Sequence, residues 1–434
     1  MESSSPVARL GRWVRGHGAL AVSAMAALAS MALVPPDAAY LGYFDLKTLG
    51  CLFCVLATSS ALRLMGAFDR AARSIIARFR RPRTLGLALV LTTAALSCVA
   101  TNDMALIMML PLAAFTLVGA GHARLLPAVF ACQSLAANLC GMIAPFGNPQ
   151  NLYLYSYYGL GLGEFLGAMA LPFAASTVGV IACTWWLTGK RAGQPAEEQS
   201  AERRGEDGDA ATMGSASREA AVADNGRGGS ETRRALPSES CPASSRPMPL
   251  SRRRLALYGA LLALTMLAVF RVVPIAAAVV AVAAALAWAD RRALAAVDWA
   301  LLATFACFFV FAGNLARVPE VAAWLSPLMA DYGLLVSAGA SQVISNVPAA
   351  VLLSHFTGAW QPLLVGVNIG GAGTLVGSLA SLITLQHFAS VRKIFPRAAA
   401  LPELSTGRFL ALFSVLNFGF LAILLIACGT ASSF

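Results

Sequence analysis

The sequence predicts an all-α integral membrane protein built from two inverted repeats. Of its 434 residues, 58% are hydrophobic and only 12% are charged, and the mean hydropathy is +0.69. A soluble domain carries about 25% charged residues. Apolar segments recur in both halves of the chain, and a polar stretch rich in glycine and serine separates them. We therefore expect about nine transmembrane helices, two re-entrant hairpins and two broken helices.

The first membrane repeat is predicted to occupy residues 1–188. Two transmembrane helices come first, and a basic amphipathic segment after them is expected to lie along the membrane surface. A re-entrant hairpin, a broken helix and a further transmembrane helix complete the repeat. In order, these elements are 18–34, 48–65, the surface segment 68–83, the hairpin 84–119, the broken helix 124–158 and 164–188.

The first hairpin is inferred from two apolar arms that meet at Thr101-Asn102-Asp103. Each arm has about 16 residues, fewer than the roughly 20 that a transmembrane helix needs. An aspartate at the junction would be costly if it faced lipid, so we expect this tip to lie inside the protein. A single long bent helix and two short transmembrane helices are the alternatives.

The first broken helix is inferred from the stretch Ala144-Pro-Phe-Gly-Asn-Pro-Gln-Asn151, which interrupts an otherwise apolar segment. Backbone polar groups in lipid must be satisfied internally, so such a break survives only where protein or a cavity surrounds it. Broken helices near the middle of the bilayer build ion and substrate sites in secondary transporters. A second break, Asn368-Ile-Gly-Gly-Ala-Gly-Thr374, occupies a matching position in the other half.

The second membrane repeat is predicted at residues 253–434. Residues 189–252 contain almost no large apolar side chains and are predicted to form a disordered cytoplasmic linker. An additional transmembrane helix at 255–270 follows the linker, and the elements then repeat the order of the first half. They are 274–288, 299–315, the surface segment 318–329, the hairpin 332–357, the broken helix 360–388 and 408–428.

The two halves align at their tips and breaks. The tip Thr101-Asn102-Asp103 aligns with Ser345-Asn346-Val347. In the breaks, the aligned pairs are Asn138 with Asn368, Gly141 with Gly371, Ala144 with Thr374, Gly147 with Gly377, and Asn148 with Ser378. The additional helix at 255–270 brings the number of crossings to nine and inverts the second half relative to the first.

The positions of lysine and arginine predict the orientation. With the N-terminus in the cytoplasm, all 32 lysines and arginines fall on the cytoplasmic side except Lys47, Arg271 and Arg317, as the positive-inside rule requires. The net charge of +11 would suit a nucleic-acid partner in a soluble protein. Here the basic residues flank apolar segments, so no nucleic acid is expected. We expect an inner (plasma) membrane protein with a cytoplasmic N-terminus and linker and an external C-terminus.

The tips and breaks together supply a candidate binding site. Helix N-termini at a tip carry free N–H groups and partial positive charge, which suits an anion. Hydroxyl, amide and carbonyl oxygens suit a hard cation such as sodium. The candidate substrate and ion ligands are Thr101, Asn102, Asp103, Gly147, Asn148, Gln150, Ser345, Asn346, Gly373 and Thr374. Candidate sodium ligands are Thr101, Asn102, Ser345, Asn346 and nearby backbone carbonyls. For any single residue, a hydrogen bond between helices is the alternative.

Asp103 is the only acidic residue at a tip, and its aligned partner is Val347. It could bind a cation, carry a proton, or pair with a backbone N–H, and the three readings stay open. The sequence shows no hydrolase, kinase or zinc-protease motif on a plausible site, so no enzyme activity and no cofactor are expected. Sodium or a proton would serve as coupling ion.

Four motifs, in this order, resemble the ion transporter superfamily, which includes divalent anion:sodium symporters, citrate transporters and arsenite permeases. They are Thr101-Asn102-Asp103, the stretch from Ala144 to Tyr153, Ser-Asn-Val-Pro-Ala-Ala from Ser345, and Val-Asn-Ile-Gly-Gly-Ala-Gly-Thr-Leu from Val367. The likeness covers about residues 40–190 and 255–430. It implies a homodimer that works by an elevator motion, with a scaffold, a moving transport domain and the surface segments as connecting arms.

The resemblance also implies roles at the tips. In the symporters each tip is Ser-Asn-Thr and contributes to binding of the substrate carboxylate and sodium. By position that role passes to Thr101, Asn102, Ser345 and Asn346, whereas Asp103 and Val347 replace the two threonines. The loss of those hydroxyls puts dicarboxylate binding and coupling to two sodium ions in doubt. The Asp103 carboxylate would repel a dianion unless it is protonated or ion-paired.

These observations predict a secondary active transporter for a small anion, with di- and tricarboxylates as candidates, coupled to sodium or protons. One alternative is a sodium/proton antiporter of the same fold with Asp103 as its site. Another is a channel or metalloid-efflux subunit driven by a partner ATPase. The expected partners are the small anionic substrate, membrane lipid and a second copy of the chain.

Overall fold

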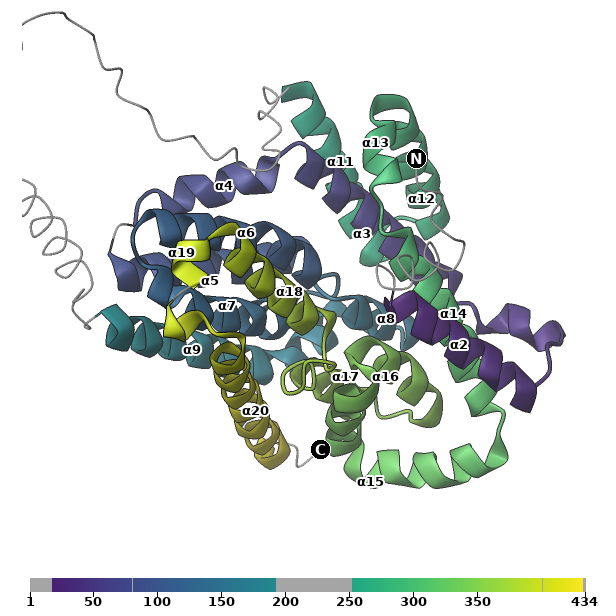
Figure 1. Ribbon diagram of the computed structural model, residues 1–434. Coiled ribbons are helices and arrows are strands. Elements are labelled where there is room, and N and C mark those ends of the chain that lie inside the picture. Colours follow the sequence, from purple (N-terminus) through teal and green to yellow (C-terminus); the bar gives the residue numbers. More distant parts are fainter. Residues whose placement is uncertain (1–17, 80, 193–251, 400, 432–434) are drawn as a thin grey trace, which may run out of the picture.

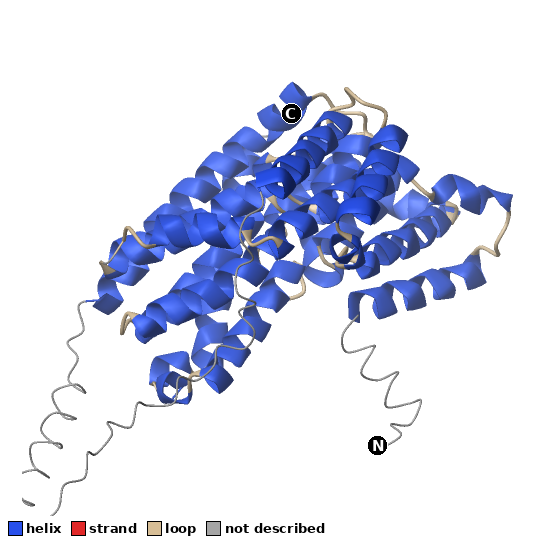
Figure 2. Ribbon diagram, turned by 90° about the horizontal axis from the view of Figure 1, so that it is seen from above, coloured by secondary structure: helices blue, strands red, loops and turns tan. Residues whose placement is uncertain are grey.

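Every regular element that the computed structural model describes is a helix (Figure 2). The structure describes residues 18–79, 81–192, 252–399 and 401–431. Residues 1–17, at the start of the first predicted repeat, lie outside the described residues. The same holds for residues 193–251, which make up most of the predicted linker. The predicted all-α fold is confirmed.

The first half follows the predicted order of elements (Figure 1). Asp45 caps the second transmembrane helix through the N–H groups of Lys47 and Thr48, and Pro82 occupies the first turn of the first hairpin arm. The helices are α2 (Gly18–Leu33), α3 (Leu46–Leu64), α4 (Ala67–Ile76), α5 (Pro82–Val99), α6 (Asn102–Gly119), α7 (Leu126–Leu135), α8 (Pro149–Tyr157) and α9 (Leu162–Ala192), with the short turn η1 (Ala38–Tyr43) after α2.

The second half differs from prediction most clearly at α15. The surface segment and the first arm of the second hairpin form one helix, α15, which bends at Tyr332, where φ is −130° and ψ is 30°. The helices are α11 (Arg252–Val269), α12 (Ile275–Ala289), α13 (Arg291–Ala295), α14 (Trp299–Ala316), α15 (Pro319–Ile344), α16 (Asn346–Leu353), α17 (Trp360–Ile369), α18 (Leu379–Ile394), α19 (Pro396–Ala399) and α20 (Thr406–Ala431).

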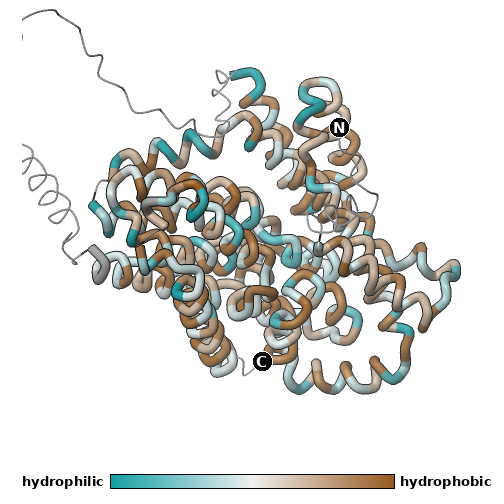
Figure 3. The backbone as a smooth tube through the Cα atoms, in the orientation of Figure 1, coloured by the Kyte–Doolittle hydropathy of each residue, from teal (hydrophilic) through white to brown (hydrophobic). Residues whose placement is uncertain are grey.

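Eight helices among the described residues are long and apolar enough to cross a membrane. Apolar residues cover α12 and α20, whereas polar residues gather on α4 and at the start of α11 (Figure 3). The protein is therefore an integral, multi-pass membrane protein. Both arms of the first hairpin, α5 and α6, have 18 residues and are among the eight. They pack against each other, and their re-entrance stays a prediction.

The helices pack around two apolar cores. A smaller core joins one face of α3 to α11, α12 and α13 through buried residues such as Leu56, Tyr258 and Val282. A larger core joins both hairpins to both broken helices, and also to α9 and to α20. Helix α2 packs along α14, and α4 contacts both α3 and α5. In Figure 1, α4 and α15 lie on opposite sides of the molecule, as the two predicted surface segments should.

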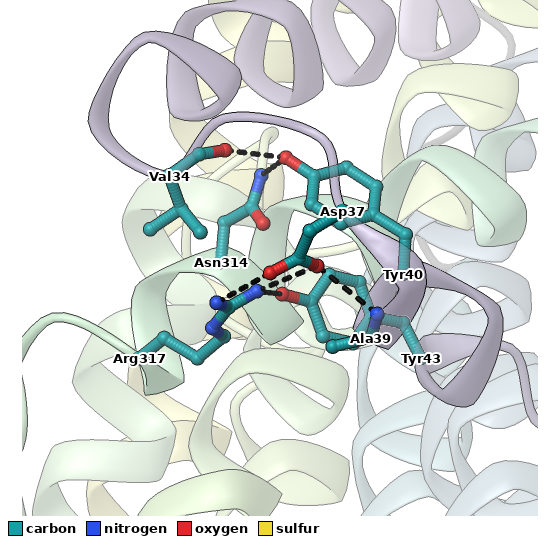
Figure 4. Close-up of polar contacts among 7 residues, drawn as sticks. All are labelled: Val34, Asp37, Ala39, Tyr40, Tyr43, Asn314 and Arg317. Atoms are coloured by element: carbon teal, nitrogen blue, oxygen red, sulfur yellow. Dashed lines mark hydrogen bonds and ion pairs between the residues drawn. The ribbon is translucent and has the colours of Figure 1, made fainter.

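An ion pair fixes the segment after α2 to the end of α14 (Figure 4). An Nη2 of Arg317 lies 2.7 Å from a carboxylate oxygen of Asp37, and Nη1 donates to the hydroxyl of Tyr43 at 3.0 Å. Asn314 donates to the hydroxyl of Tyr40 at 2.9 Å. The Arg317 guanidinium lowers the pKa of Asp37 from its ordinary value. These contacts join two segments that the predicted threading places on the same side of the membrane.

Other contacts between helix ends agree with the same threading. Arg271 donates to the carbonyls of Gly159 and Tyr155 at 2.9 and 2.8 Å, and all three lie at predicted external ends. Tyr258 donates to Asp290 at 2.9 Å, and both lie at predicted cytoplasmic ends. Which end faces the cytoplasm stays a prediction.

Candidate functional site

The first tip docks onto the first break. Thr101 is the N-cap residue of α6 and is buried. The backbone N–H of Asn102 donates to the carbonyl of Gly147 at 3.2 Å, and its side-chain oxygen accepts from the N–H of Asp103 at 2.9 Å. The polar tip is thus held inside the protein rather than left in lipid, as the sequence predicts.

At the first break, the helix changes type before the chain becomes extended. After α7 the chain forms a π-helical turn (Ala136–Cys140) and a 3₁₀ turn (Gly141–Ile143), and Ala144 is extended. Such π-turns occur frequently at functional sites. Asn151 donates to the carbonyl of Met142 at 3.0 Å, which satisfies one orphaned acceptor of the break. A methyl group on Gly147 would collide with the carbonyl oxygen of Gly141, so only glycine fits there.

The second tip makes the contact that aligns with the first. The backbone N–H of Asn346 donates to the carbonyl of Gly377 at 3.1 Å, and Gly377 aligns with Gly147. Ser345 begins α16 with φ of 73° and ψ of 156°, and its hydroxyl donates to the side chain of Asn346 at 3.4 Å. Each tip therefore binds the break of its own half through the same backbone contact.

Gln342, which the sequence analysis missed, shapes the second break. Its side-chain nitrogen donates to the carbonyls of Gly370 and Ala372 at 2.8 and 3.1 Å, and its side-chain oxygen accepts from the N–H of Thr374 at 2.8 Å. The hydroxyl of Thr374 donates back to the backbone carbonyl of Gln342 at 2.9 Å and so stabilises the loop. Gly373, with φ of 116°, leaves room for the Gln342 amide. The signal in the sequence was an amide side chain on an otherwise mostly apolar arm, a turn before the tip.

Cys98 occupies the position in the first hairpin that aligns with Gln342. Its sulfur donates to the carbonyl of Cys140 at 3.4 Å, and Cys140 aligns with Gly370. The two contacts correspond in position. The first half has the weak thiol donor of Cys98, whereas the second half has the amide of Gln342, which both donates and accepts. The two breaks are therefore related in position and unequal in chemistry.

An asparagine of the first half is bound to the second half. The side-chain oxygen of Asn138 accepts from the amide of Asn102 at 3.1 Å and from the hydroxyl of Ser378 at 2.8 Å. Its nitrogen donates to the carbonyl of Gly371 at 3.4 Å. Asn138 therefore connects the first tip to the start of α18.

The aligned asparagine of the second half is bound to the first half. The side-chain oxygen of Asn368 accepts from the amides of Asn148 and Gln150 at 3.4 and 3.5 Å. Its nitrogen donates to the side chain of Asn151 at 2.6 Å and to the carbonyl of Leu364 at 2.8 Å. Because Asn148 aligns with Ser378, the two halves exchange corresponding contacts. This relation supports a two-fold site, while inversion of the complete halves stays a prediction.

The carbonyl of Leu364 fixes the direction of these amides. A carbonyl only accepts, so the nitrogen of Asn368 must face it and the oxygen of Asn368 must face Asn148 and Gln150. The oxygens of Asn148 and Gln150 therefore point away from Asn368. Within the described part of the chain, neither oxygen has a hydrogen-bond partner, and the same holds for Oδ1 of Asp103. Unpartnered buried oxygens are costly and need an explanation.

The structure brings some of the predicted site residues together and gives others local roles. Asn102, Asn148 and Gln150 belong to the buried amide network, and Gly147 accepts from the first tip. Thr374 and Gly373 shape the second loop. Across the described ranges, no three histidine, cysteine or acidic side chains gather to hold a metal ion. The oxygens that could ligate sodium are therefore amide, hydroxyl and carbonyl oxygens, together with Asp103.

A membrane fold with a buried polar site at broken helices is typical of membrane transporters, and comparison with known proteins gives the family. A family model described as "Citrate transporter" matches residues 12–363, and the chain belongs to that family. The chain is 28% identical to "Inner membrane protein YbiR" of Escherichia coli over 81% of this chain and 82% of that protein. It is 27% identical to "Uncharacterized transporter MJ0456" of Methanocaldococcus jannaschii over 78% and 80%, respectively. The resemblance drawn from the four motifs is confirmed, and the protein is a transporter rather than an enzyme.

Proposed function

We propose that the protein is a secondary active transporter that moves a small carboxylate anion, such as a di- or tricarboxylate, together with a coupling cation. The observation that carries this proposal is the buried amide network between the tips and the breaks. It contains Asn148 and Gln150, whose oxygens are buried and without a protein partner among the described residues. Buried amide oxygens without a partner also occur at Gln133, Asn314 and Asn417 among the described residues, so the cation site is supported by the position of the first two oxygens, those of Asn148 and Gln150, between the tips and the breaks.

The start of α8 is the proposed place for the anion. Asn148 is the N-cap residue of α8, but its side chain makes no capping hydrogen bond because its amide reaches Asn368. Ser378, by contrast, accepts from the N–H of Ala380 at 3.2 Å and caps α18. The first N–H groups of α8 are therefore free of a cap and carry the partial positive charge of a helix start. A carboxylate near them would be stabilised, and a cation beside it would balance the charge.

Asp103 is the proposed partner of the cation. It lies in the first turn of α6, next to Asn102, and one of its carboxylate oxygens is buried and unpartnered among the described residues. Sodium or a proton at this carboxylate would remove its repulsion toward an anionic substrate. Coupling follows because the anion binds well only when the cation is bound.

The proposed motion is of the elevator type in a homodimer in the inner membrane. The smaller core around α3, α11, α12 and α13 would form the scaffold, and the larger core would carry the site across the membrane. The contacts of α4 with α3 and α5, and of α15 with α14 and α16, suit the proposed role of these helices as connecting arms.

Transport measurements on proteoliposomes test the proposal. Radiolabelled citrate uptake into vesicles is measured with an inward sodium gradient, with an inward proton gradient, and with neither. We expect uptake in one of the two gradients. Proton movement driven by a sodium gradient in the absence of any anion would instead identify the antiporter, and arsenite movement would identify the metalloid permease.

Variants at the tips test the location of the site. We expect Asn102→Ala and Asn346→Ala to abolish uptake while the protein still elutes as a single peak in size-exclusion chromatography. Asn417→Ala is the matched control, because Asn417 is a buried amide of α20 bonded to its own helix through the carbonyl of Phe413. Normal uptake by both tip variants would place the site elsewhere. Asp103→Asn should change the pH or sodium dependence of uptake, and unchanged dependence would make this acid structural.

A further inference from the structure

A hollow of about 450 Å³ lies outside the candidate transport site, between α4 and the first hairpin. Pockets for small molecules are typically about 300–1,000 Å³. In Figure 1, α4 lies beside α5 and α6, and α4 contacts α5 directly. The hollow is lined by Arg73, Ile76, Ala77, Phe79, Leu85, Leu112, Thr116 and Ala120.

The lining is apolar apart from one cation and one hydroxyl. Of the lining residues, Ile76 and Leu85 are buried, whereas Phe79 is 39% exposed. Arg73 is exposed on the same helix as Ile76, one turn earlier. An occupant that matches this surface has a long apolar part and one anionic group.

The surroundings of the hollow are strongly basic. Arg73, Arg78 and Arg81 are exposed on α4 and on the turn that follows it, and Asp69 is the only acid on α4. Arg83 is stacked over the ring of Trp185 on α9 at 5.7 Å and so is engaged with the protein. A basic amphipathic helix at the cytoplasmic surface attracts anionic lipid headgroups.

We propose that this hollow binds one anionic phospholipid, with an acyl chain against Leu112 and Ile76 and the phosphate on the guanidinium of Arg73. The apolar lining disfavours a free phosphate or another small soluble anion, because such an ion would leave the hollow's apolar surface in contact with water. The guanidinium favours an anionic headgroup over a zwitterionic one, because both headgroups carry the phosphate but the ammonium of a choline headgroup repels the guanidinium.

Lipid titration of the purified full-length protein tests this assignment. Detergent-purified protein is titrated with dioleoylphosphatidylglycerol or with dioleoylphosphatidylcholine, and bound lipids are counted by native mass spectrometry. We expect one phosphatidylglycerol to bind at least about tenfold more tightly than phosphatidylcholine, because Arg73 and the neighbouring arginines repel the choline ammonium. Inorganic phosphate at millimolar concentration should not displace it.

Three variants locate the lipid. Arg73→Gln should weaken phosphatidylglycerol binding about tenfold, because it removes one charge-assisted hydrogen bond. Arg78→Gln is the matched control, since it removes the same charge from the same surface but does not line the hollow. Leu112→Trp should fill the hollow and exclude the acyl chain. Equal losses for Arg73→Gln and Arg78→Gln, equal affinity for the two lipids, displacement by phosphate, or unchanged binding to Leu112→Trp would each overturn the proposal.

Discussion

Ser345 adopts a backbone conformation that only glycine reaches without strain. Its φ of 73° and ψ of 156° fall outside the regions that residues with a side chain normally populate. The strain persists because Ser345 is held from both sides. Its own N–H donates to the carbonyl of Ser341, and the next N–H, of Asn346, donates to Gly377. Strained residues of this kind cluster at functional sites, which supports the proposed role of the Ser345 hydroxyl in binding.

Replacing Ser345 by glycine should make the protein more stable and less active. The strain is worth about 1–3 kcal/mol, so Ser345→Gly should raise the melting temperature by about 2 °C. Uptake should fall because the hydroxyl is lost. Thr101→Gly is the control, since Thr101 has an ordinary extended conformation with φ of −67° and ψ of 155°. It should lower the melting temperature, and a rise for both variants would show that Ser345 is not strained.

Gly147→Ala should be strongly destabilising. A methyl group there would collide with the carbonyl oxygen of Gly141, which is backbone and cannot turn away. We expect a loss of about 2–3 kcal/mol or failure to accumulate in the membrane. Gly167→Ala on α9 is the control, because no neighbouring atom lies within 4 Å of its added methyl carbon. Thermal melting followed by fluorescence-detected chromatography measures both. A variant as stable as Gly167→Ala would mean that the break can relax.

At the scale of elements, the Asp37–Arg317 pair should make the anchoring of η1 to α14 depend on pH. The pKa of Asp37 is lowered in the folded protein, so the pair contributes stability above the unfolded value of about 3.9. That contribution is lost as the pH falls through the lower folded pKa. Asp37→Asn should therefore lower the melting temperature slightly at pH 7, and the difference should vanish in acid below the usual carboxyl range.

Salt checks the origin of that difference. The two side chains are 40% and 42% exposed, so the pair is screened by ions and contributes modestly. The difference between Asp37→Asn and the unchanged protein should shrink in 1 M NaCl at pH 7. A difference that is independent of both salt and pH would assign the effect to packing instead.

The elements were largely predictable because membrane helices leave simple patterns. The break at Ala144–Asn151 and the tips at Asn102 and Asn346 were recognised as polar groups in apolar surroundings, which lipid does not tolerate. The bend of α15 at Tyr332 was predicted as a boundary between two segments, but the helix continues through it. Gly333, directly after Tyr332, marks the place in the sequence, but a glycine is compatible with either a bend or an end of a helix, so local sequence does not decide between them.

The site was predictable in outline and not in its connections. Asn138 and Asn368 were recognised by alignment, but their exchange of contacts with Ser378 and Asn148 depends on how the halves pack. Gln342 was missed because its aligned partner, Cys98, has no amide to mark the position. Long-range side-chain contacts are set by tertiary packing, which hydrophobic periodicity alone does not encode.

At the scale of the whole molecule, the exchanged amides predict that neither half folds alone. Residues up to 192 and residues from 252 onward can be produced as separate chains. Each fragment expressed alone should be degraded, since the amide of Asn138 or Asn368 would lose its partner in the membrane. Co-expression should restore citrate uptake and a complex that copurifies through a tag on one fragment. Stable accumulation of either fragment by itself would contradict this prediction.

The exchange of amide contacts between the halves also determines when the polar network can form during synthesis. Asn138 and Ser378 are 240 residues apart, and translation proceeds at about 5–20 residues per second, so Asn138 waits roughly 12–50 s for its partner. During that interval a half-finished chain sits in the bilayer with a polar break that its own residues do not complete. The polar network therefore stays incomplete for more than half of the time that synthesis of the 434 residues takes. Slower ribosomes would lengthen that interval in direct proportion.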